Sequence, residues 1–459
     1  MNYLGIDLDI RNLPDLDQDF IPMGPWMIEY EKEAIRPIGI AIEREEGKVT
    51  VFETKLRDAS FEEANLRYLE RYIKFCLWSV GGWKVTVCGC DEEAARVREE
   101  YVLGGPRDFD VNFMMNTYER PFEFEICASS DLPAANDSDK SVGGHLEGCR
   151  IGFDAGGSDR KVSAVIDGET VYSEEVVWHP KLHADPEYQY NGIMESMKTA
   201  ASKMPRVDAI GVSSAGTFRN NCIRHSSLFI KVPRDVMDTR VKTMYLDIAR
   251  ELGNVPIEVA NDGDVTALAG AMDMDAGCVL GIAMGTSEAG GYVDRQGNIT
   301  GWLNELAFVP VDMNPDAMVD EWSGDYGCGV KYFSQDAVIK LAPAAGIALD
   351  EALSPAEKLK VVQKRMEEDD PHAADIYRTI GVYFGYSIAW YCEFYDIEHV
   401  LVMGRVTSGK GGSIIIDTAR ELLETEFPEL AAKVELSIPD ESSRRVGQSV
   451  AAASLPDIG

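Results

Sequence analysis

The sequence has little basic charge and lacks a long apolar run. Lys and Arg number 44 against 78 Asp and Glu, which gives a formal net charge of −34. A field of that sign repels phosphate groups and argues against duplex nucleic acid or an anionic membrane as a partner. No stretch of the sequence approaches the ~20 apolar residues that a membrane-spanning helix needs. We therefore expect no nucleic-acid partner and no membrane partner.

Signs of secretion are also missing from the sequence. The nine cysteines are scattered over 459 residues and form no disulfide framework. The N-terminal segment lacks the basic start and apolar core of a signal peptide. These absences predict a reducing, cytoplasmic compartment.

Hydrophobic residues make up 45% of the chain, which is typical of a folded protein, and the length allows two or three domains. Residues 1–30 are acidic and contain prolines, and we expect an extended arm there. Residues 1–145 as a whole predict a small acidic α/β domain. Its expected elements are a hairpin at 37–56, a helix at 59–78, a strand at 84–90, a helix at 91–102 and strands at 109–119 and 122–128. A polar stretch at 129–148 predicts a linker.

From Arg150 the sequence predicts two similar α/β halves, 150–272 and 276–459, each opened by a glycine-rich hairpin. In the first half we expect a hairpin at 151–171, helices at 191–204, 240–252 and 263–272, and strands at 207–216 and 255–262. In the second half we expect a hairpin at 278–294, helices at 356–368, 373–395, 415–427 and 447–455, and strands at 399–404 and 434–439. Two such halves suggest an internal duplication with a cleft between them.

Both hairpins carry glycines between two apolar runs. The first turn reads Asp154-Ala155-Gly156-Gly157-Ser158, and the second begins Gly285-Thr286. Glycine lets the backbone approach a ligand closely, so the N–H groups of such a turn can cradle a phosphate. An aspartate at the strand end can hold Mg²⁺, directly or through water. A plain hairpin with a glycine turn is the alternative for each motif taken alone.

Two further motifs follow buried strands. Asn261-Asp262 ends the strand VPIEVA, where open α/β sheets keep their ligands, and a carboxylate there can accept a proton from a substrate hydroxyl. The alternative is that Asp262 caps the next helix. The run VLVMGRVTSG ends in a loop at Gly404-Arg405 that can wall a nucleotide base or ribose; a structural turn is the alternative.

The order of these four motifs resembles that of the sugar kinase/actin/heat-shock ATPase superfamily. More narrowly, about residues 150–456 resemble the ROK family of sugar kinases and repressors. The stretches that carry the resemblance are IGFDAGGS, GVSSAGTFRNNCIRHSSLFIKVP, VPIEVANDGDVTALAGA, LGIAMGTSEAGGYVDRQGNITGWLNELAFVPVD and VLVMGRVTSG. The resemblance implies a duplicated RNase H-like (actin-like ATPase) two-lobe fold, here with an additional small N-terminal α/β domain. It also implies ATP and Mg²⁺ as cofactors, phosphoryl transfer to a hexose or hexose derivative, and a homodimer.

The resemblance also assigns roles to residues. Asp262 would be the general base, Asn261 would hold a sugar hydroxyl, and Glu305 would contact the substrate. Asp154 would lie near the metal and the phosphates, and Gly404 beside the adenosine. The remaining nucleotide-binding positions would be Gly156, Gly157, Ser158, Gly285, Thr286 and Arg405, although Arg405 stands where a second glycine is usual and could equally obstruct adenine.

The sugar and zinc parts of the ROK pattern are altered. Phe308 stands at the position of a His that touches sugar and zinc in that family, and Val330 stands at the position of a sugar-contacting Glu. In the usual CxCGxxGC cluster, Glu321 and Ser323 replace two cysteines and Cys328 remains. One thiol cannot complete a tetrahedral N/S site. We therefore predict no structural zinc.

The leading hypothesis is an ATP-dependent, Mg²⁺-requiring sugar kinase. The alternative is a non-catalytic ROK-like sensor of sugar or nucleotide that signals through its extra domain. An ATPase coupled to conformational work is a third hypothesis, which the Asn261-Asp262 and Glu305 pattern disfavours. Residues 1–145 are acidic and β-rich, unlike the basic helix-turn-helix of ROK repressors, and a lid, a dimerisation unit or a remnant module are all open.

Overall fold

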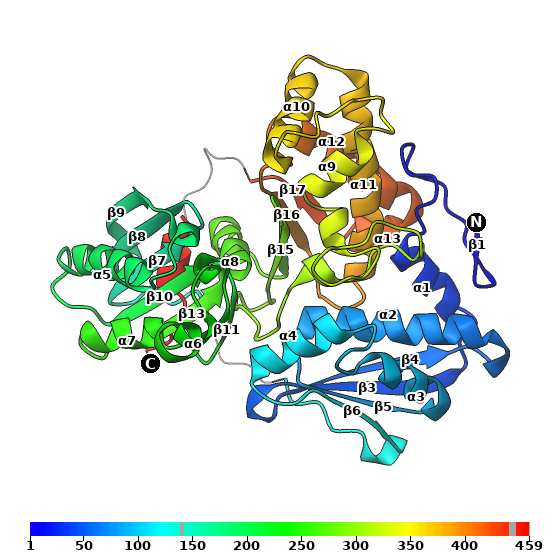
Figure 1. The fold of residues 1–459 in the computed structure, drawn as a ribbon, viewed down its shortest axis with the longest axis horizontal. Helices are drawn as coiled ribbons and strands as arrows, with labels where there is room; N and C mark the ends of the chain where they lie inside the picture. The colour runs from blue at the N-terminus through cyan, green and yellow to red at the C-terminus, as the bar shows by residue number, and fades with distance from the viewer. Residues whose placement is uncertain (138–141, 440–446, 459) are drawn as a thin grey trace. The chain divides into compact units, whose positions relative to one another are not determined.

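The computed structural model describes residues 1–137, 142–439 and 447–458. The chain forms two compact units (Figure 1). Unit 1 comprises Met1–Ser138, Ile282–Gly290 and Trp302–Ile438, and unit 2 comprises Asp139–Gly281, Gly291–Gly301 and Pro439–Gly459. Unit 1 therefore joins the N-terminal segment to most of the predicted second half.

Unit 2 is built on a five-stranded sheet in the order β13-β10-β7-β8-β9. The strands are β7 (Cys149–Ala155), β8 (Asp159–Ile166), β9 (Glu169–Val177), β10 (Ala209–Ser214) and β13 (Ile257–Asn261). The strands β13, β10 and β7 are parallel, whereas β8 and β9 run antiparallel to their neighbours. Parallel strands end at one edge of the sheet, so the loops after β7, β10 and β13 lie together.

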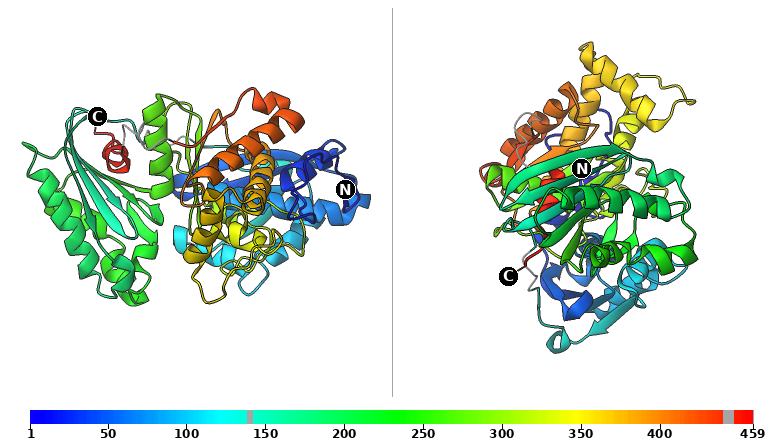
Figure 2. Two further views of the ribbon diagram at one scale, coloured as in Figure 1. Left: turned by 90° about the horizontal axis from the view of Figure 1, so that it is seen from above. Right: turned by 90° about the vertical axis from the view of Figure 1, so that its left-hand side faces the viewer.

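Helices cover both faces of this sheet (Figure 2). They are α5 (Glu187–Ala201) and α7 (Met244–Glu251) on one face, and α8 (Asp262–Met274) and α14 (Gln448–Ala453) on the other. The helix α14 lies directly on glycines of β7 and β10: a Cβ on Gly152 would come within 1.6 Å of the Ser449 carbonyl oxygen. This closing helix thus packs on the sheet of the first half, although the predicted division placed all of 276–459 together.

Unit 1 contains two four-stranded sheets, ordered β4-β3-β5-β6 and β15-β14-β16-β17. The N-terminal elements are α1 (Met23–Glu31), β3 (Arg36–Glu43), β4 (Val49–Leu56), α2 (Glu62–Val80), β5 (Lys84–Cys88), α3 (Asp91–Glu100), α4 (Asp108–Tyr118) and β6 (Glu123–Cys127). The later elements are β14 (Val279–Met284), β15 (Glu288–Val293), α9 (Gln335–Leu341), α10 (Pro355–Glu367), α11 (Pro371–Tyr391), β16 (His399–Met403), α12 (Lys410–Glu426) and β17 (Glu435–Ser437). The strands β14 and β15 continue across the unit boundary. Short elements of unit 1 are β1 (Asn2–Tyr3), β2 (Ile6–Asp7) and α13 (Pro428–Ala431), and those of unit 2 are β11 (Thr217–Arg219), β12 (Cys222–His225) and α6 (Arg234–Val236).

The N-terminal elements share a core with the rest of unit 1. Helix α2 packs aromatic side chains against the end of α11: Phe75 lies 5.6 Å from Trp390 and 4.2 Å from Phe394, centroid to centroid. Tyr72 contacts the same two rings. Aromatic pairs at these distances contribute packing beyond their buried area. Residues 1–138 are therefore joined to the later elements by a continuous core.

Most expected elements are confirmed, with shifted ends, but two expectations for the N-terminal segment are wrong. The segment 109–119, predicted as a strand, is the helix α4, in which Val111 and Met114 are buried at helical spacing. The predicted extended arm contains α1 at Met23–Glu31, whose Trp26 and Tyr30 are buried. The prolines that suggested an arm are tolerated because Pro25 lies in the first turn of the helix.

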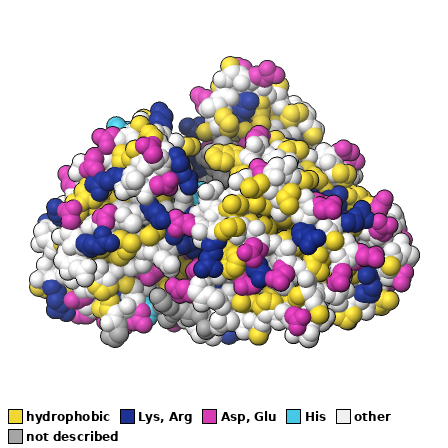
Figure 3. All heavy atoms as spheres, turned by 60° about the horizontal axis from the view of Figure 1, so that its bottom comes forward, with side chains coloured by type: hydrophobic (Ala, Val, Ile, Leu, Met, Phe, Trp, Pro, Cys, Tyr) yellow, Lys and Arg dark blue, Asp and Glu magenta, His cyan; other side chains and the backbone are white. Residues whose placement is uncertain are grey.

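The division into 1–145, 150–272 and 276–459 stays a prediction, and so do the expected absences of a nucleic-acid partner and of a membrane partner. Part of the predicted linker, 138–141, lies outside the described residues. On the face shown in Figure 3, Lys and Arg side chains lie among acidic and apolar ones. Among the described residues, no helix is long and apolar enough to span a membrane.

Candidate functional site

The first glycine turn joins β7 to β8 at the sheet edge where the parallel strands end. Asp154, the penultimate residue of β7, is 6% exposed, and its Oδ1 accepts a hydrogen bond from the Ser213 hydroxyl at 2.8 Å. A Cβ on Gly156 would lie 2.8 Å from the Asp159 carbonyl oxygen, so the turn needs glycine there. Gly157 and Ser158 are exposed. The turn thus presents its backbone to solvent beside a buried carboxyl group.

Asn261 and Asp262 lie at the junction of β13 and α8. The Asn261 Oδ1 accepts the Gly263 N–H at 2.7 Å, and its Nδ2 donates to the Gly216 carbonyl at 2.7 Å. Asn261 is therefore the N-cap, the role weighed for Asp262 as its alternative. Asp262 is the first helical residue; it is half-buried, and its Oδ1 accepts the Gly263 N–H at 3.1 Å. The carboxylate therefore lies at a helix N-terminus.

Strand register brings the two aspartates to one place. Asp154 pairs with Ser213, and Ser213 pairs with Ala260 next to Asn261. Gln448 of α14 ties this edge together by donating to the Ser213 Oγ at 3.2 Å and the Asp262 carbonyl at 3.0 Å. Burial, together with the charge of Asp262, raises the pKa of Asp154 to about 6. Burial also raises the pKa of Asp262, although the Gly263 N–H and Lys181 oppose that shift.

Lys181 is a site residue that the sequence did not reveal. It is exposed in the 3-10 turn Pro180–Leu182, and its Nζ would lie 3.3 Å from a Cβ on Gly157. A cation there faces the turn that we predict to bind phosphate. The residue follows β9 in an irregular segment without a motif, so no sequence signal marked it.

The second glycine turn lies in unit 1 beside the predicted adenosine loop. Thr286 is exposed and Gly285 half-buried, between β14 and β15. Gly404 has φ +104°, and a Cβ on it would lie 2.4 Å from the Met284 carbonyl oxygen, so a side chain is excluded. The Val406 N–H also donates to that oxygen at 3.0 Å. Arg405 is exposed, which leaves its side chain available to a ligand.

Glu305 is half-buried just before a short 3-10 helix, Leu306–Phe308. The preceding residue, Asn304, has φ +52°, and its Oδ1 accepts a hydrogen bond from the Tyr395 hydroxyl at 3.0 Å. The Glu305 backbone N–H donates to the Trp78 carbonyl of α2 at 3.0 Å. The N-terminal helix α2 therefore supports the backbone of Glu305, a predicted substrate-binding residue. The sequence alone did not predict this contact.

The residues aligned with the ROK zinc ligands come together but do not fit zinc. Phe308 packs against Cys328 and Val330, and the Ser323 Oγ lies 3.9 Å from the Cys328 Sγ. The Glu321 Oε2 instead contacts the Lys331 Nζ at 2.5 Å, with 71% of the Glu321 side chain exposed. Burial raises the pKa of the Cys328 thiol to about 11, which keeps it protonated. A single neutral thiol beside an aromatic ring is a poor donor set for Zn²⁺.

The structure thus forms two groups of predicted site residues, each within one unit. Unit 2 holds Asp154, Gly156, Gly157, Ser158, Asn261 and Asp262, and unit 1 holds Gly285, Thr286, Glu305, Gly404 and Arg405.

Comparisons with known proteins give a fold but no close relative. No family model and no curated protein matches the sequence. A ROK hexokinase from Thermus thermophilus superposes with a TM-score of 0.52 at 18% identity, covering 67% of this chain and 97% of that one. A ROK family transcriptional regulator, a homologue of the E. coli MLC protein, gives a TM-score of 0.52 at 17% identity, covering 68% and 79%. The chain therefore has the two-lobe α/β fold found in ROK kinases and regulators, as predicted, and about a third of it is additional to that fold.

Proposed function

We propose that this protein is an ATP-dependent kinase of a hexose or hexose derivative, with Asp262 as the general base. The observation that carries the proposal is the pair of aspartates at the edge of the unit 2 sheet. Asp262 lies half-buried at the start of α8, next to the buried Asp154 and a glycine turn exposed to solvent. A positioned base beside a phosphate-binding turn is what phosphoryl transfer requires.

In the proposed reaction the Asp262 carboxylate accepts the proton of the sugar hydroxyl. The hydroxyl oxygen forms a bond to the γ-phosphorus of ATP, and the bond from that phosphorus to the bridging oxygen of ADP breaks. The raised pKa of Asp262 makes it a better proton acceptor than an ordinary aspartate. Asn261 fixes the turn through its two backbone hydrogen bonds, and its second amide N–H remains for a sugar hydroxyl. Glu305 contributes a second sugar contact.

The phosphates would lie against the backbone of Gly156, Gly157, Ser158, Gly285 and Thr286, with the adenosine at Gly404 and Arg405. Asp154 fits a divalent cation, because burial and the charge of Asp262 raise its pKa and a cation beside it would favour its ionised form. A bound Mg²⁺ supplies positive charge that offsets the charge of the transferring phosphoryl group. Lys181 adds a fixed positive charge beside Gly157. The protein would act on small sugars in the cytoplasm, as a homodimer and without structural zinc.

The test is a phosphorylation screen with ATP and Mg²⁺ against hexoses, amino sugars and acetylated amino sugars. We expect turnover on at least one sugar, reduced by a factor of about 10²–10⁴ in Asp262→Asn because the base is lost. Asp275→Asn is the matched control, since Asp275 is exposed at the other end of α8 in the left-handed conformation that Asn tolerates. Equal turnover in both variants would remove Asp262 from the mechanism.

One observation favours a non-catalytic sensor as the second candidate. Phe308 places a ring at the position of the sugar-contacting His, and this ring packs against Trp78 in a tilted arrangement, with centroids 4.4 Å apart. Sugar- or nucleotide-dependent thermal shifts without turnover on any sugar would establish the sensor and exclude the kinase.

A further inference from the structure

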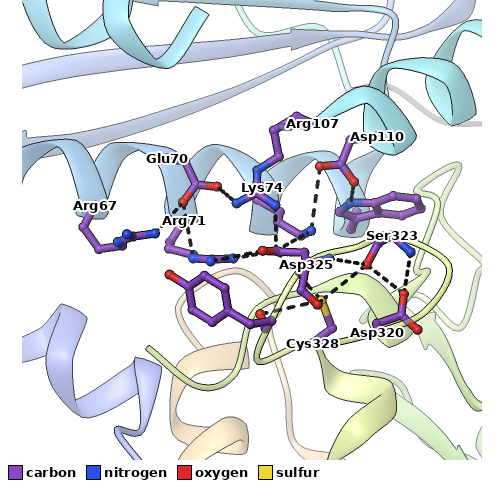
Figure 4. A network of polar contacts seen from close by, with 12 residues as sticks. Arg67, Glu70, Arg71, Lys74, Arg107, Asp110, Asp320, Ser323, Asp325 and Cys328 are labelled. Atoms are coloured by element: carbon purple, nitrogen blue, oxygen red, sulfur yellow. Dashed lines mark hydrogen bonds and ion pairs between the residues drawn. The ribbon is translucent and has the colours of Figure 1, made fainter. Parts of the chain in front are cut away.

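Helix α2 of the N-terminal domain carries a buried row of charged side chains. Glu70, Arg71 and Lys74 lie on one face of this helix, and Arg71 and Lys74 have fully buried side chains. This face meets the loop 320–328, the same loop in which Glu321, Ser323 and Cys328 occupy the zinc-ligand positions (Figure 4). The positions aligned with the ROK zinc ligands therefore lie against the N-terminal segment.

Asp325 is the centre of this contact. Its Oδ2 lies 2.6 Å from Arg71 Nη1, 2.7 Å from Lys74 Nζ and 2.7 Å from Arg107 Nη1. Burial alone would raise the pKa of Asp325, but Arg71, Lys74 and Arg107 outweigh it and hold that pKa well below its usual range. The guanidinium of Arg71 also stacks on the Tyr326 ring at 4.2 Å. Four contacts thus fix the two residues 325–326.

The charges of the network balance. Among its buried members, three cations face three carboxylates, namely Arg71, Lys74 and Arg107 with Glu70, Asp110 and Asp325; the partly exposed Arg67 adds a further contact to Glu70 at 3.6 Å. Buried charges are tolerated when they are paired in this way. A divalent metal ion beside Cys328 would add two positive charges next to three buried cations. The network and a zinc ion are therefore alternatives for this loop.

The same helix also holds the segment that carries Glu305. The carbonyls of Trp78, Ser79 and Val80, in the last turn of α2, accept the backbone N–H groups of Glu305, Asn304 and Leu303 at 3.0, 2.9 and 3.0 Å. Trp78 in turn is fixed by its Nε1, which donates to Asp110 Oδ1 at 2.9 Å. The ring of Phe308, three residues after Glu305, packs against the Trp78 ring. One helix thus holds both segments that the metal links in the ROK pattern.

We propose that helix α2, with Arg107, replaces the zinc ion of the ROK pattern as the brace of residues 303–308 and 320–328. The N-terminal segment then supports the unit 1 group of predicted site residues. Arg71, Lys74 and Arg107 are positioning residues for the Glu305 backbone. The proposal concerns packing and does not depend on the proposed kinase activity.

Hydrogen exchange of the full-length chain tests the brace. We expect Lys74→Met, which keeps the side-chain length and removes the charge, to speed exchange of amides 303–305 and 320–328 several-fold. The control Lys84→Met removes a lysine from the same domain that pairs with Glu125 at 2.6 Å, and should leave these amides unchanged. Amides of β10 in unit 2 should be unaffected in both variants. Equal exchange in the two variants would overturn the proposal.

Metal analysis and a double-mutant cycle give independent readouts. The wild-type protein should contain no stoichiometric zinc, and a chelator should not change the exchange of 303–328; one zinc per chain would overturn the proposal. Lys74→Met and Asp325→Asn should each lower the midpoint of thermal unfolding by roughly 5–15 °C. The double variant restores charge balance, so its unfolding midpoint should fall by less than the sum of the two single-variant decreases. Additive decreases would contradict the network. If Lys74→Met does not fold, Arg107→Lys is used in its place. It should speed exchange of the same amides and lower the unfolding midpoint by smaller amounts.

Discussion

The two groups of candidate site residues differ in how they are held. In unit 2, Asp154, Asn261 and Asp262 are placed by the sheet itself, because parallel strands in register deliver them to one edge. In unit 1, Glu305 is placed by a helix from outside the ROK-like region, which supports its backbone through the Trp78 carbonyl. The sheet-borne group keeps the residues that the family resemblance assigns, whereas the region around Glu305 keeps that residue but differs from the family pattern at Phe308 and Val330.

This difference suggests where sequence change is tolerated. A carboxylate at the end of a central strand is held in one place by the sheet, and no other residue can take its place. Replacing it therefore removes the proposed metal ligand or base. A structural ligand can be replaced by any set of contacts that holds the same loop, here buried ion pairs around Asp325. The predictions below test the contrast, starting with the largest expected effect.

Replacing Asp154 should stabilise the protein while impairing the proposed activity. Its pKa of about 6 in the folded state lies above its ordinary value, so the folded state binds a proton more tightly than the unfolded state does. That stabilisation is present below about pH 4 and is lost as the pH rises through about 6. Asp154→Asn should therefore raise the free energy of unfolding at pH 7.5 by about 1–3 kcal/mol, with a smaller gain at pH 5.

Urea unfolding at the two pH values measures this effect. Asp208 is the control in the same unit, because hydrogen bonds from Arg206 and from the Cys149 N–H lower its pKa. Asp208→Asn should lose stability at pH 7.5. A destabilised Asp154→Asn at pH 7.5 would show that the carboxylate is favourably held without a cation, against the assignment of Asp154 to Mg²⁺.

Restoring the family residue in unit 1 should not restore a metal site. In Phe308→His, an imidazole would lie between Trp78 and Phe109, whose rings are 4.4 and 5.2 Å from that of Phe308. Burying its polar nitrogens there should cost about 1–2 kcal/mol of unfolding free energy, and the three cations around Asp325 should still disfavour zinc. Phe308→Leu, which stays apolar, is the control for lost ring packing. Urea unfolding and zinc analysis are the measurements, and stoichiometric zinc in Phe308→His would show that the cations do not exclude a metal.

The sequence marked the positions of the unit 2 group, whose roles stay predictions, but gave no sign of the contacts between α2 and residues 320–328; both outcomes have physical reasons. Strand-to-loop junctions such as Val259–Asp262 carry local signals: β-branched residues, then polar ones, then a helix. The contact between Arg71 and Asp325 joins residues 254 positions apart, and each taken alone reads as a solvated surface charge. The segment 109–119, predicted as a strand, is a helix in which the buried Val111 and Met114 follow helical spacing.

Lys181 offers the finest test of the unit 2 group, since it acts through charge alone. Lys181→Met should lower kcat/KM for ATP by roughly 3–10-fold, because an exposed charge near a phosphate contributes about 1 kcal/mol in water. Lys181 also lowers the pKa of Asp262, so its loss should move the acidic limb of the pH–rate profile to higher pH. The matched control is Lys203→Met, which removes a lysine that lies over Tyr172 in the same unit.

The pH profile separates this role from a structural one. Loss of packing would lower activity at every pH, whereas loss of a nearby positive charge shifts the limb and fades as salt increases. High salt should therefore bring the wild-type and Lys181→Met profiles together. If the two profiles stay fully separated at high salt, Lys181 acts by direct contact and not through its charge alone. The phosphate turn of unit 2 would then depend on contacts of one side chain, as the Glu305 segment depends on contacts with α2.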